Sequence, residues 1–300
     1  MTARETGLPG PLAGKVAILT GAGSSLGKSH ALYLAAQGAR VVVNDVAFSA
    51  AGAAVDAIVE AGGEAIAATG SVTDEQAVAQ MVTDAITAWG AIDILVNNAG
   101  VLRDKSFAKM ALEDFRHVLD VHLMGAAICT KAVWEPMRAN SGGRIVFTTS
   151  SSGLWGNFGQ SNYGAAKMAL VGLMQTLSIE GTKHDIRVNC LAPTAATQMT
   201  EGIWSEEDLA DLSPSLVSPG LLPLVIEDAP TRAILCAGAG HFARAEIMLT
   251  PGVFLGFEDD PGEALQSKWT AVGALEGAVV PENAMAQSRR ELASKRARTV

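Results

Sequence analysis

Short apolar runs alternate along the chain with longer stretches in which polar and apolar residues are mixed. Each run is brief, apolar or β-branched, and bounded by Gly, Pro or polar positions, a pattern typical of buried strands. The runs predicted as strands are Val16–Thr20, Arg40–Asn44, Glu64–Ala68, Ile92–Asn97, Arg144–Thr149, Arg187–Ala192 and Ile247–Leu249. The stretches predicted as helices include Leu26–Gln37, Ala50–Ala61, Asp74–Trp89, Leu112–Met137 and Asn162–Gly181.

This alternation predicts an α/β fold, a doubly wound and mostly parallel sheet with helices on both faces. Crossovers between parallel strands are right-handed, so the carboxyl ends of the strands should share the edge where ligands bind. Thr194–Pro230 departs from the rhythm because it is rich in Pro, Leu and Ser. We expect it to be a substrate-covering insertion, with Leu216–Val225 as an apolar lid.

Composition narrows the function classes. The 300 residues are 49% hydrophobic and 18% charged, which excludes a disordered chain and leaves room for one large domain or two small ones. A net charge of −9 disfavours nucleic acid and anionic membranes as partners. Residues 282–300 carry five basic and two acidic side chains, so the preceding 281 residues carry −12. Such a basic end predicts an exposed helix docked on an acidic body or a partner subunit, with nucleic-acid contact as a minor alternative.

Targeting signals and metal-binding patterns are not evident in the sequence. The first 14 residues lack the apolar core of a secretory signal, and each apolar stretch is interrupted before it could span a bilayer. Cys129, Cys190 and Cys236 form no metal-like cluster, and we expect them to be small buried side chains. We therefore predict a cytoplasmic protein without a membrane span or a bound metal.

A glycine-rich string follows the first predicted strand and opens the first predicted helix. Gly21, Gly23 and Gly27 would let backbone N–H groups and the helix N-terminus approach a pyrophosphate. Two nucleotide-binding loops compete for this string. Gly27-Lys28-Ser29 matches the end of a P-loop, but the first glycine of that motif would fall on Ala22, so we favour the dinucleotide loop.

Asp45 ends the second predicted strand, where dinucleotide-binding folds place an acid that holds the ribose. A carboxylate accepts hydrogen bonds from both ribose hydroxyls and repels a 2′-phosphate, and neither Val46 nor Ala47 supplies a compensating positive charge. The sequence therefore favours NAD over NADP. The alternative is that Asp45 only caps the next helix.

Further motifs follow the glycine loop in a fixed order. Asn97-Asn98-Ala99-Gly100 comes first, and Tyr163-x-x-x-Lys167 follows, with Ser150 thirteen residues before the tyrosine. With Thr20-Gly21-x-x-x-x-x-Gly27, this set resembles the short-chain dehydrogenase/reductase family over about residues 12–255.

The resemblance implies a single Rossmann-like domain with a seven-stranded parallel sheet. We expect that catalytic domain to span residues 1–257, with a lid over about 194–230 and a C-terminal extension over 258–300. It also implies a homodimer or homotetramer that associates through the helices near Leu112–Met137 and Asn162–Gly181.

The resemblance also implies roles for individual residues. Tyr163 would be the general base, Ser150 would bind the substrate oxygen, and Lys167 one helical turn away would favour the phenolate and hold the ribose. His122 stands where the family has a relay asparagine and would pass protons toward water, or would only be satisfied by a backbone carbonyl. The cofactor-binding residues implied are Gly21, Ser24, Ser25, Leu26, Gly27, Asp45, Ser71, Val72, Asn98, Ala99, Gly100, Tyr163, Lys167, Pro193 and Thr197.

Three positions depart from the family pattern. Ser25 replaces the middle glycine of the loop, which should narrow the approach to the pyrophosphate or add a hydroxyl contact. Pro193-Thr194 replaces the usual Pro-Gly after the sixth strand. Thr197 best matches the threonine that holds the nicotinamide amide, in a loop one residue shorter.

Segments such as Asn97–Phe107 and Trp155–Tyr163 resemble the dehydrogenase domains of peroxisomal multifunctional enzymes of type 2 more closely. This likeness implies oxidation of a (3R)-hydroxyacyl-CoA, whose phosphates would need a local cluster such as Arg103 and Lys105 in an acidic protein. A hydroxysteroid of the 17β type, or a steroid side-chain CoA ester, is the alternative substrate. An NAD-binding scaffold without catalysis is the alternative from another class, and the complete catalytic set argues against it.

Overall fold

The computed structural model describes residues 10–197, 205–256 and 260–296. The chain divides into two compact units, Met1–Arg244 and Ala245–Val300. The boundary that we expected at residue 257, between the catalytic domain and the C-terminal extension, lies outside the described residues and stays a prediction.

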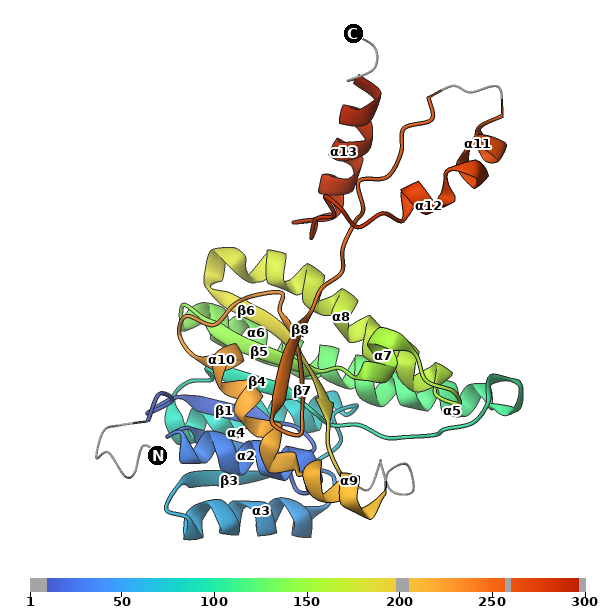
Figure 1. Ribbon diagram of the computed structural model, residues 1–300. Helices are drawn as coiled ribbons and strands as arrows, with labels where there is room; N and C mark the ends of the chain where they lie inside the picture. The colour runs from blue at the N-terminus through green and yellow to red at the C-terminus, as the bar shows by residue number, and fades with distance from the viewer. Residues whose placement is uncertain (1–9, 198–204, 257–259, 297–300) are drawn as a thin grey trace. The chain divides into compact units, whose positions relative to one another are not determined.

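A single sheet forms the centre of the first unit, in the order β3-β2-β1-β4-β5-β6-β7-β8 (Figure 1). All the pairs from β3 through β7 are parallel, as the alternating pattern predicted. The strands are β1 (Val16–Leu19), β2 (Arg40–Asp45), β3 (Glu64–Thr69), β4 (Ile94–Asn97), β5 (Gly143–Thr148), β6 (Ile186–Thr194), β7 (Ile234–Gly238) and β8 (His241–Ala245).

The sheet has eight strands rather than the seven expected, and the last prediction fell on the wrong segment. The seventh strand is Ile234–Gly238, which pairs along its whole length with Cys190–Thr194 of β6. A two-residue connection then leads into β8, a spacing that joins antiparallel neighbours. Ile247–Leu249 forms no strand; it lies in the second unit, where Leu249 makes an isolated antiparallel bridge with Val279.

Helices form a layer on each side of the sheet (Figure 1). In one layer α2 contacts α3, and in the other α4 packs against α6 while α5 packs against α8. The predicted helix Leu112–Met137 is divided into α5, the π-helical turn η2 and α6. The bounds are α2 (Ser25–Ala36), α3 (Phe48–Glu60), α4 (Glu75–Trp89), η1 (Phe107–Lys109), α5 (Leu112–Leu119), η2 (Asp120–Met124), α6 (Gly125–Ala139), α7 (Ser151–Trp155), α8 (Ser161–Gly181) and η3 (Thr182–His184).

The segment predicted as a lid is partly exposed and partly packed in the core. It forms α9 (Glu206–Asp211), η5 (Pro214–Leu216), η6 (Ser218–Leu221) and α10 (Leu222–Val225), and residues 198–204 of it lie outside the described residues. Val217, Leu221, Leu224 and Val225 are buried in the same cluster as β1 and α2. These four side chains pack in the core and so do not form the apolar lid expected over Leu216–Val225, whereas Leu216 is exposed and the rest of the lid stays a prediction.

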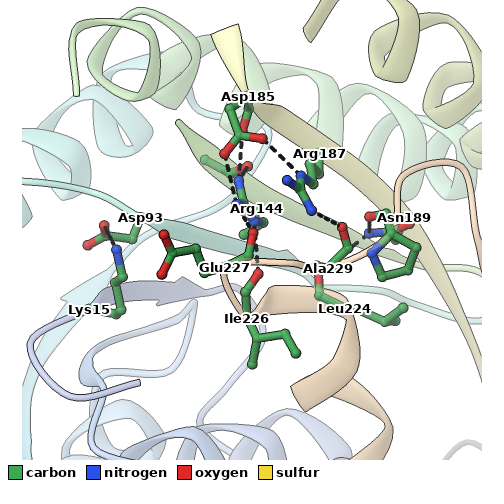
Figure 2. Close-up of polar contacts among 12 residues, drawn as sticks. Lys15, Asp93, Arg144, Asp185, Arg187, Asn189, Leu224, Ile226, Glu227 and Ala229 are labelled. Atoms are coloured by element: carbon green, nitrogen blue, oxygen red, sulfur yellow. Dashed lines mark hydrogen bonds and ion pairs between the residues drawn. The ribbon is translucent and has the colours of Figure 1, made fainter. Parts of the chain in front are cut away.

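A cluster of arginines anchors the chain just after α10, at the edge where β5 and β6 begin (Figure 2). The buried Arg144 guanidinium donates to the carbonyls of Ile226, Glu227 and Asp185 and, at 2.9 Å, to the Asp185 carboxylate. Arg187 joins Asp185 to the carbonyl of Ala229. These bonds fix the return path of the chain from α10 to β7, at the edge opposite the one that carries the predicted site residues.

The second unit is described by itself, and its helices are exposed. It contains α11 (Pro261–Ser267), α12 (Trp269–Val272) and the basic α13 (Ala284–Arg296), none of which has a buried residue. The Thr250 hydroxyl donates to the Val272 carbonyl, 2.7 Å away, and so ties the loop before α11 to the end of α12. The predicted C-terminal helix exists, and its docking partner stays a prediction.

The cysteines and the helix lengths bear on two expectations from the sequence, that the cysteines are buried and that the chain has no membrane span. Cys129 and Cys190 are buried, as expected, and none of the three cysteines is in a disulfide. Within the part of the chain that the structure describes, no helix has the length and apolar character needed to cross a membrane.

Candidate active site

One cavity of about 590 Å³ lies at the carboxyl edge of the sheet and is lined by every residue predicted for the site. Since parallel strands end at this edge, residues far apart in sequence meet there. From the first half of the chain it is lined by Gly21, Ser24, Ser25, Leu26, Gly27, Asp45, Ser71, Val72, Asn98, Ala99, Gly100 and His122. From the second half it is lined by Ser150, Tyr163, Lys167, Pro193 and Thr197.

The glycine loop presents an uncapped helix N-terminus to this cavity. Ser24 is the N-cap residue of α2, yet its side chain accepts no capping hydrogen bond. The first-turn N–H groups are therefore not satisfied by a capping side chain, which is the arrangement that binds a phosphate at a helix N-terminus. A Cβ on Gly27 would lie 2.0 Å from the Gly21 carbonyl oxygen, so this tight turn requires glycine. The loop thus fits the pyrophosphate of a dinucleotide.

Asp45 is oriented by backbone groups on both sides of its carboxylate. Oδ2 accepts from the Gly23 N–H and Oδ1 from the Ala47 N–H, each at 3.0 Å. α3 begins at Phe48 without a side-chain cap, so Asp45 is not the cap of the next helix. Each carboxylate oxygen keeps an acceptor site for a ribose hydroxyl.

Asn98 ties the glycine loop to the end of β4. Its amide donates to the carbonyls of Thr20 and Gly21, both at 3.1 Å, and the Thr20 hydroxyl accepts from the N–H groups of Asn98 and Ala99. A Cβ on Gly100 would lie 2.2 Å from Cε1 of His122. The Asn-Asn-Ala-Gly motif therefore acts here through packing and backbone hydrogen bonds that shape the cavity.

Tyr163 and Lys167 lie one turn apart on α8, with the Lys167 amino nitrogen 5.4 Å from the centre of the phenol ring. The amino group donates to the Thr148 carbonyl at 2.6 Å, while the Thr149 hydroxyl donates to the Lys167 carbonyl at 2.7 Å. Burial of Lys167 lowers its pKa to about 7. The end of β5 therefore holds this amino group in place by hydrogen bonds.

The pKa of Tyr163 departs from its ordinary value in the direction opposite to the one expected. Burial raises the pKa, and the nearby Asp104 carboxylate raises it further, while a hydrogen bond with Ser150 lowers it. We expected the lysine cation to favour the phenolate, but in this structure burial is the larger effect. Tyr163 is accordingly a protonated phenol at neutral pH.

His122 lies in η2, the π-helical turn between α5 and α6, a local irregularity that is frequent at functional sites. Its Nε2 atom lies 2.8 Å from the Val101 carbonyl, and its ring meets the Tyr163 ring edge-on at 5.2 Å. Burial, with a smaller contribution from Lys167, lowers the pKa of His122 to about 3, so the imidazole is neutral.

A void of about 10 Å³ borders His122, Asn97 and Lys167. Nδ1 of His122 and Oδ1 of Asn97 are both buried without a hydrogen-bond partner. A polar void of this size suits one water molecule with these two atoms as its partners.

Sequence reasoning missed a polar network beside the catalytic residues. The buried Gln160 donates to Asp104 at 2.6 Å and accepts from Ser152 at 2.7 Å and from Asn157 at 3.0 Å. These bonds join the loop after β4 to the loop after β5, and Gln160 and Asn157 line the cavity. Their position just before Tyr163, in a loop rich in amides, is the signal that could have identified them.

Comparison with known proteins agrees with this geometry. Residues 15–208 match the family model described as short chain dehydrogenase. A short-chain type dehydrogenase/reductase of Mycobacterium tuberculosis is 40% identical, over 89% of this chain and 96% of its own length.

Two solved structures are also similar. The full-length peroxisomal multifunctional enzyme type 2 of Drosophila melanogaster has a TM-score of 0.79 and 37% identity; the match covers 94% of this chain and 49% of the fly chain. A 7α-hydroxysteroid dehydrogenase complexed with NADH and 7-oxo glycochenodeoxycholic acid has a TM-score of 0.71 and 32% identity, over 76% of this chain and 94% of its own. The chain therefore belongs to the short-chain dehydrogenase family, and it is an oxidoreductase with a Rossmann-like fold.

Proposed function

We propose that this chain is an NAD-dependent dehydrogenase that oxidises the hydroxyl group of a (3R)-hydroxyacyl-CoA to a ketone. The observation that carries the proposal is the convergence of Ser150, Tyr163 and Lys167 on one cavity whose other end carries the Asp45 carboxylate. Proton transfer groups and a dinucleotide cradle in one cavity are what hydride transfer from an alcohol requires.

The cofactor would lie between the glycine loop and α8. The uncapped N-terminus of α2 would hold the pyrophosphate, Asp45 the adenosine ribose, and Lys167 the ribose next to the nicotinamide. The Asp45 carboxylate disfavours a 2′-phosphate by charge repulsion, which is the reason for choosing NAD over NADP. When bound, NAD supplies an acceptor for the hydride that leaves the alcohol carbon.

The positive nicotinamide ring of bound NAD would favour the phenolate over the phenol that burial favours, and the Tyr163 phenolate would then remove the proton of the substrate hydroxyl as general base. Ser150, already hydrogen-bonded to the phenol, would hold the substrate oxygen as charge develops on it. Lys167, whose pKa is lowered by burial to about 7, can pass a proton to or from the site. Neutral His122 would not carry this proton itself; its Nδ1 atom would position a water molecule in the small polar void that it shares with Lys167.

The substrate class rests on the likeness to the fly enzyme, of which the match covers about half. Four apolar side chains of the expected lid lie in the core, so the apolar character of Leu216–Val225 does not support the choice of an apolar chain. A hydroxysteroid is the second candidate, because the similar 7α-hydroxysteroid dehydrogenase was solved with a bile-acid derivative.

We also propose that the chain forms a homodimer or homotetramer in a reducing compartment. Leu112, Met124, Met168 and Ile179 are exposed apolar side chains on the helices expected to associate, and Met168 and Ile179 are three turns apart on one face of α8. The three free cysteines suit the cytoplasm or, as in the fly enzyme's name, the peroxisome. A light-scattering mass of two or four times 31.0 kDa is expected.

A substrate and cofactor panel tests the proposed function. Appearance of the reduced cofactor is measured with (3R)- and (3S)-hydroxyacyl-CoA esters and with 7α- and 17β-hydroxysteroids, each with NAD and with NADP. We expect the highest kcat/KM for a (3R)-ester, at least tenfold higher with NAD than with NADP. A preference for a steroid, or equal efficiency with both cofactors, would overturn the corresponding part of the proposal.

A further inference from the structure

We propose that Arg103 and Lys105 form a binding site for the phosphate groups of a coenzyme A thioester, at the outer end of the catalytic cavity. This inference rests on the proposed function, since it concerns the carrier end of the proposed substrate. Leu102 lines the cavity, Arg103 follows it in the sequence and donates from Nη1 to the Leu102 carbonyl at 2.8 Å, and Lys105 follows two residues later. The Arg103 guanidinium therefore lies beside a residue of the cavity wall, and the exposed Lys105 lies two residues from it along the same segment.

The backbone of this short segment is fixed relative to the catalytic tyrosine. The amide of the buried Asn162 donates to the Arg103 carbonyl at 3.0 Å, and the Asn162 oxygen accepts from the N–H of Tyr163 at 2.8 Å. The N–H of Lys105 donates to the Gly159 carbonyl at 2.9 Å. The backbones of both cationic residues are thus hydrogen-bonded to the segment that leads into and begins α8.

The two cations are only loosely paired with a carboxylate, and Nη1 of Arg103 also donates to the Leu102 carbonyl at 2.8 Å. Arg103 and Lys105 share one carboxylate, Asp114, with nitrogen–oxygen distances of 3.9 Å and 3.7 Å. Charge-assisted hydrogen bonds are about 1 Å shorter, so neither cation is committed to this partner. The side chains are 51% and 57% exposed and can turn toward a phosphate. Asp104, the acidic residue between the two cations in the sequence, accepts a hydrogen bond from the Gln160 amide at 2.6 Å.

The charge of the whole protein makes such a site necessary for this substrate. Coenzyme A carries several negative charges, and a net charge of −9 repels it on average. The dinucleotide loop would meet its pyrophosphate with backbone N–H groups, which leaves Arg103 and Lys105 available for other phosphates. Arg103 and Lys105 supply two exposed positive charges on the segment that follows the cavity-lining Leu102.

Kinetics with matched thioesters test this site. The same (3R)-hydroxyacyl group is presented on coenzyme A and on pantetheine, which lacks phosphates, to the unmodified protein and to the double variant Arg103→Ala/Lys105→Ala. We expect the variant to raise KM for the coenzyme A ester about tenfold, with kcat within twofold, and to leave KM for the pantetheine ester unchanged. Lys183→Ala, an exposed lysine in η3, is the control and should change neither value.

Each other outcome has a distinct meaning. An equal rise in KM for both esters would overturn the site, because the substitutions would then act through the cavity wall. An unchanged KM for the coenzyme A ester would overturn it as well. Failure of the proposed function would be recognised separately, since the unmodified protein would then oxidise neither thioester.

Discussion

Ser25 occupies a backbone conformation that glycine ordinarily adopts, with a φ of 46°. The left-handed region costs a side-chain-bearing residue about 1–2 kcal/mol. This strain accounts for the glycine that the family pattern has at the position. Ser25 is the first residue of α2, whose N-terminus has no side-chain cap and faces the proposed pyrophosphate site. The sequence revealed the departure, whereas the backbone angle came only from the fold.

Replacing Ser25 with glycine should stabilise the protein. Relief of the left-handed strain outweighs the extra chain entropy of glycine, so we expect Ser25→Gly to raise the free energy of unfolding by about 0.5–1 kcal/mol. Urea denaturation of the two proteins measures this difference. A lower stability of the variant would contradict the strain argument, and Ser29→Gly, inside α2, is a control that should destabilise.

The residues around the cavity could be predicted from the sequence because each belongs to a motif with fixed spacing. All of them line the same cavity. The direction in which the pKa of Tyr163 shifts could not be predicted, because the shift depends on burial, and burial is known only from the packing of the fold. Gln160 was missed for a similar reason, since its partner Asp104 is 56 residues away.

At the scale of elements, the helices and strands were predicted well where the hydrophobic periodicity was strong. The prediction was poor for the irregular segment after β6, whose apolar side chains are buried. β1 to β6 and the long helices were predicted within a few residues. The run after β6 was interpreted as a lid because Pro and Leu suggest a loop, but its apolar side chains pack on α2 and β1. The Arg144 cluster that fixes this path joins residues about 80 positions apart, so no local pattern could reveal it.

Arg144→Met should destabilise the protein, since it leaves buried carbonyls after α10 without their donor. The Asp185 carboxylate also loses a partner, although it is half exposed, so we expect a loss of about 2–3 kcal/mol in the free energy of unfolding. Urea denaturation measures the loss. Lys15→Met breaks an exposed ion pair with Asp93 and is the control, with an expected change below about 1 kcal/mol. Equal effects of the two substitutions would contradict the anchoring role.

At the scale of the whole molecule, two buried histidines make the stability depend on pH. His30 is fully buried, with Nδ1 2.9 Å from the Ser218 hydroxyl, and burial lowers its pKa to about 3, as it does for His122. In the unfolded chain both titrate near 6.5. Between about pH 6.5 and pH 3 the unfolded state therefore binds more protons than the native state, and stability falls as the pH falls.

His30→Asn should remove the contribution of one histidine to the pH dependence of the free energy of unfolding. Each histidine contributes about 1.4 kcal/mol per pH unit in that window, so about 2 kcal/mol between about pH 6.5 and pH 5. We expect the loss of unfolding free energy between about pH 7 and pH 5 to be smaller by that amount in the variant. The measurement is urea denaturation at both pH values, and identical losses in the two proteins would show that His30 is not buried in its neutral form.

The central claim is that Tyr163 performs the proton transfer of an NAD-dependent alcohol oxidation. Tyr163→Phe removes only the phenol oxygen from α8, so the cradle for the cofactor stays intact. The decisive measurement is turnover of the best substrate of the panel by this variant, together with its affinity for NADH. We predict that turnover falls by at least about a thousandfold while the NADH affinity stays within about threefold. A variant that keeps full turnover would contradict the mechanism.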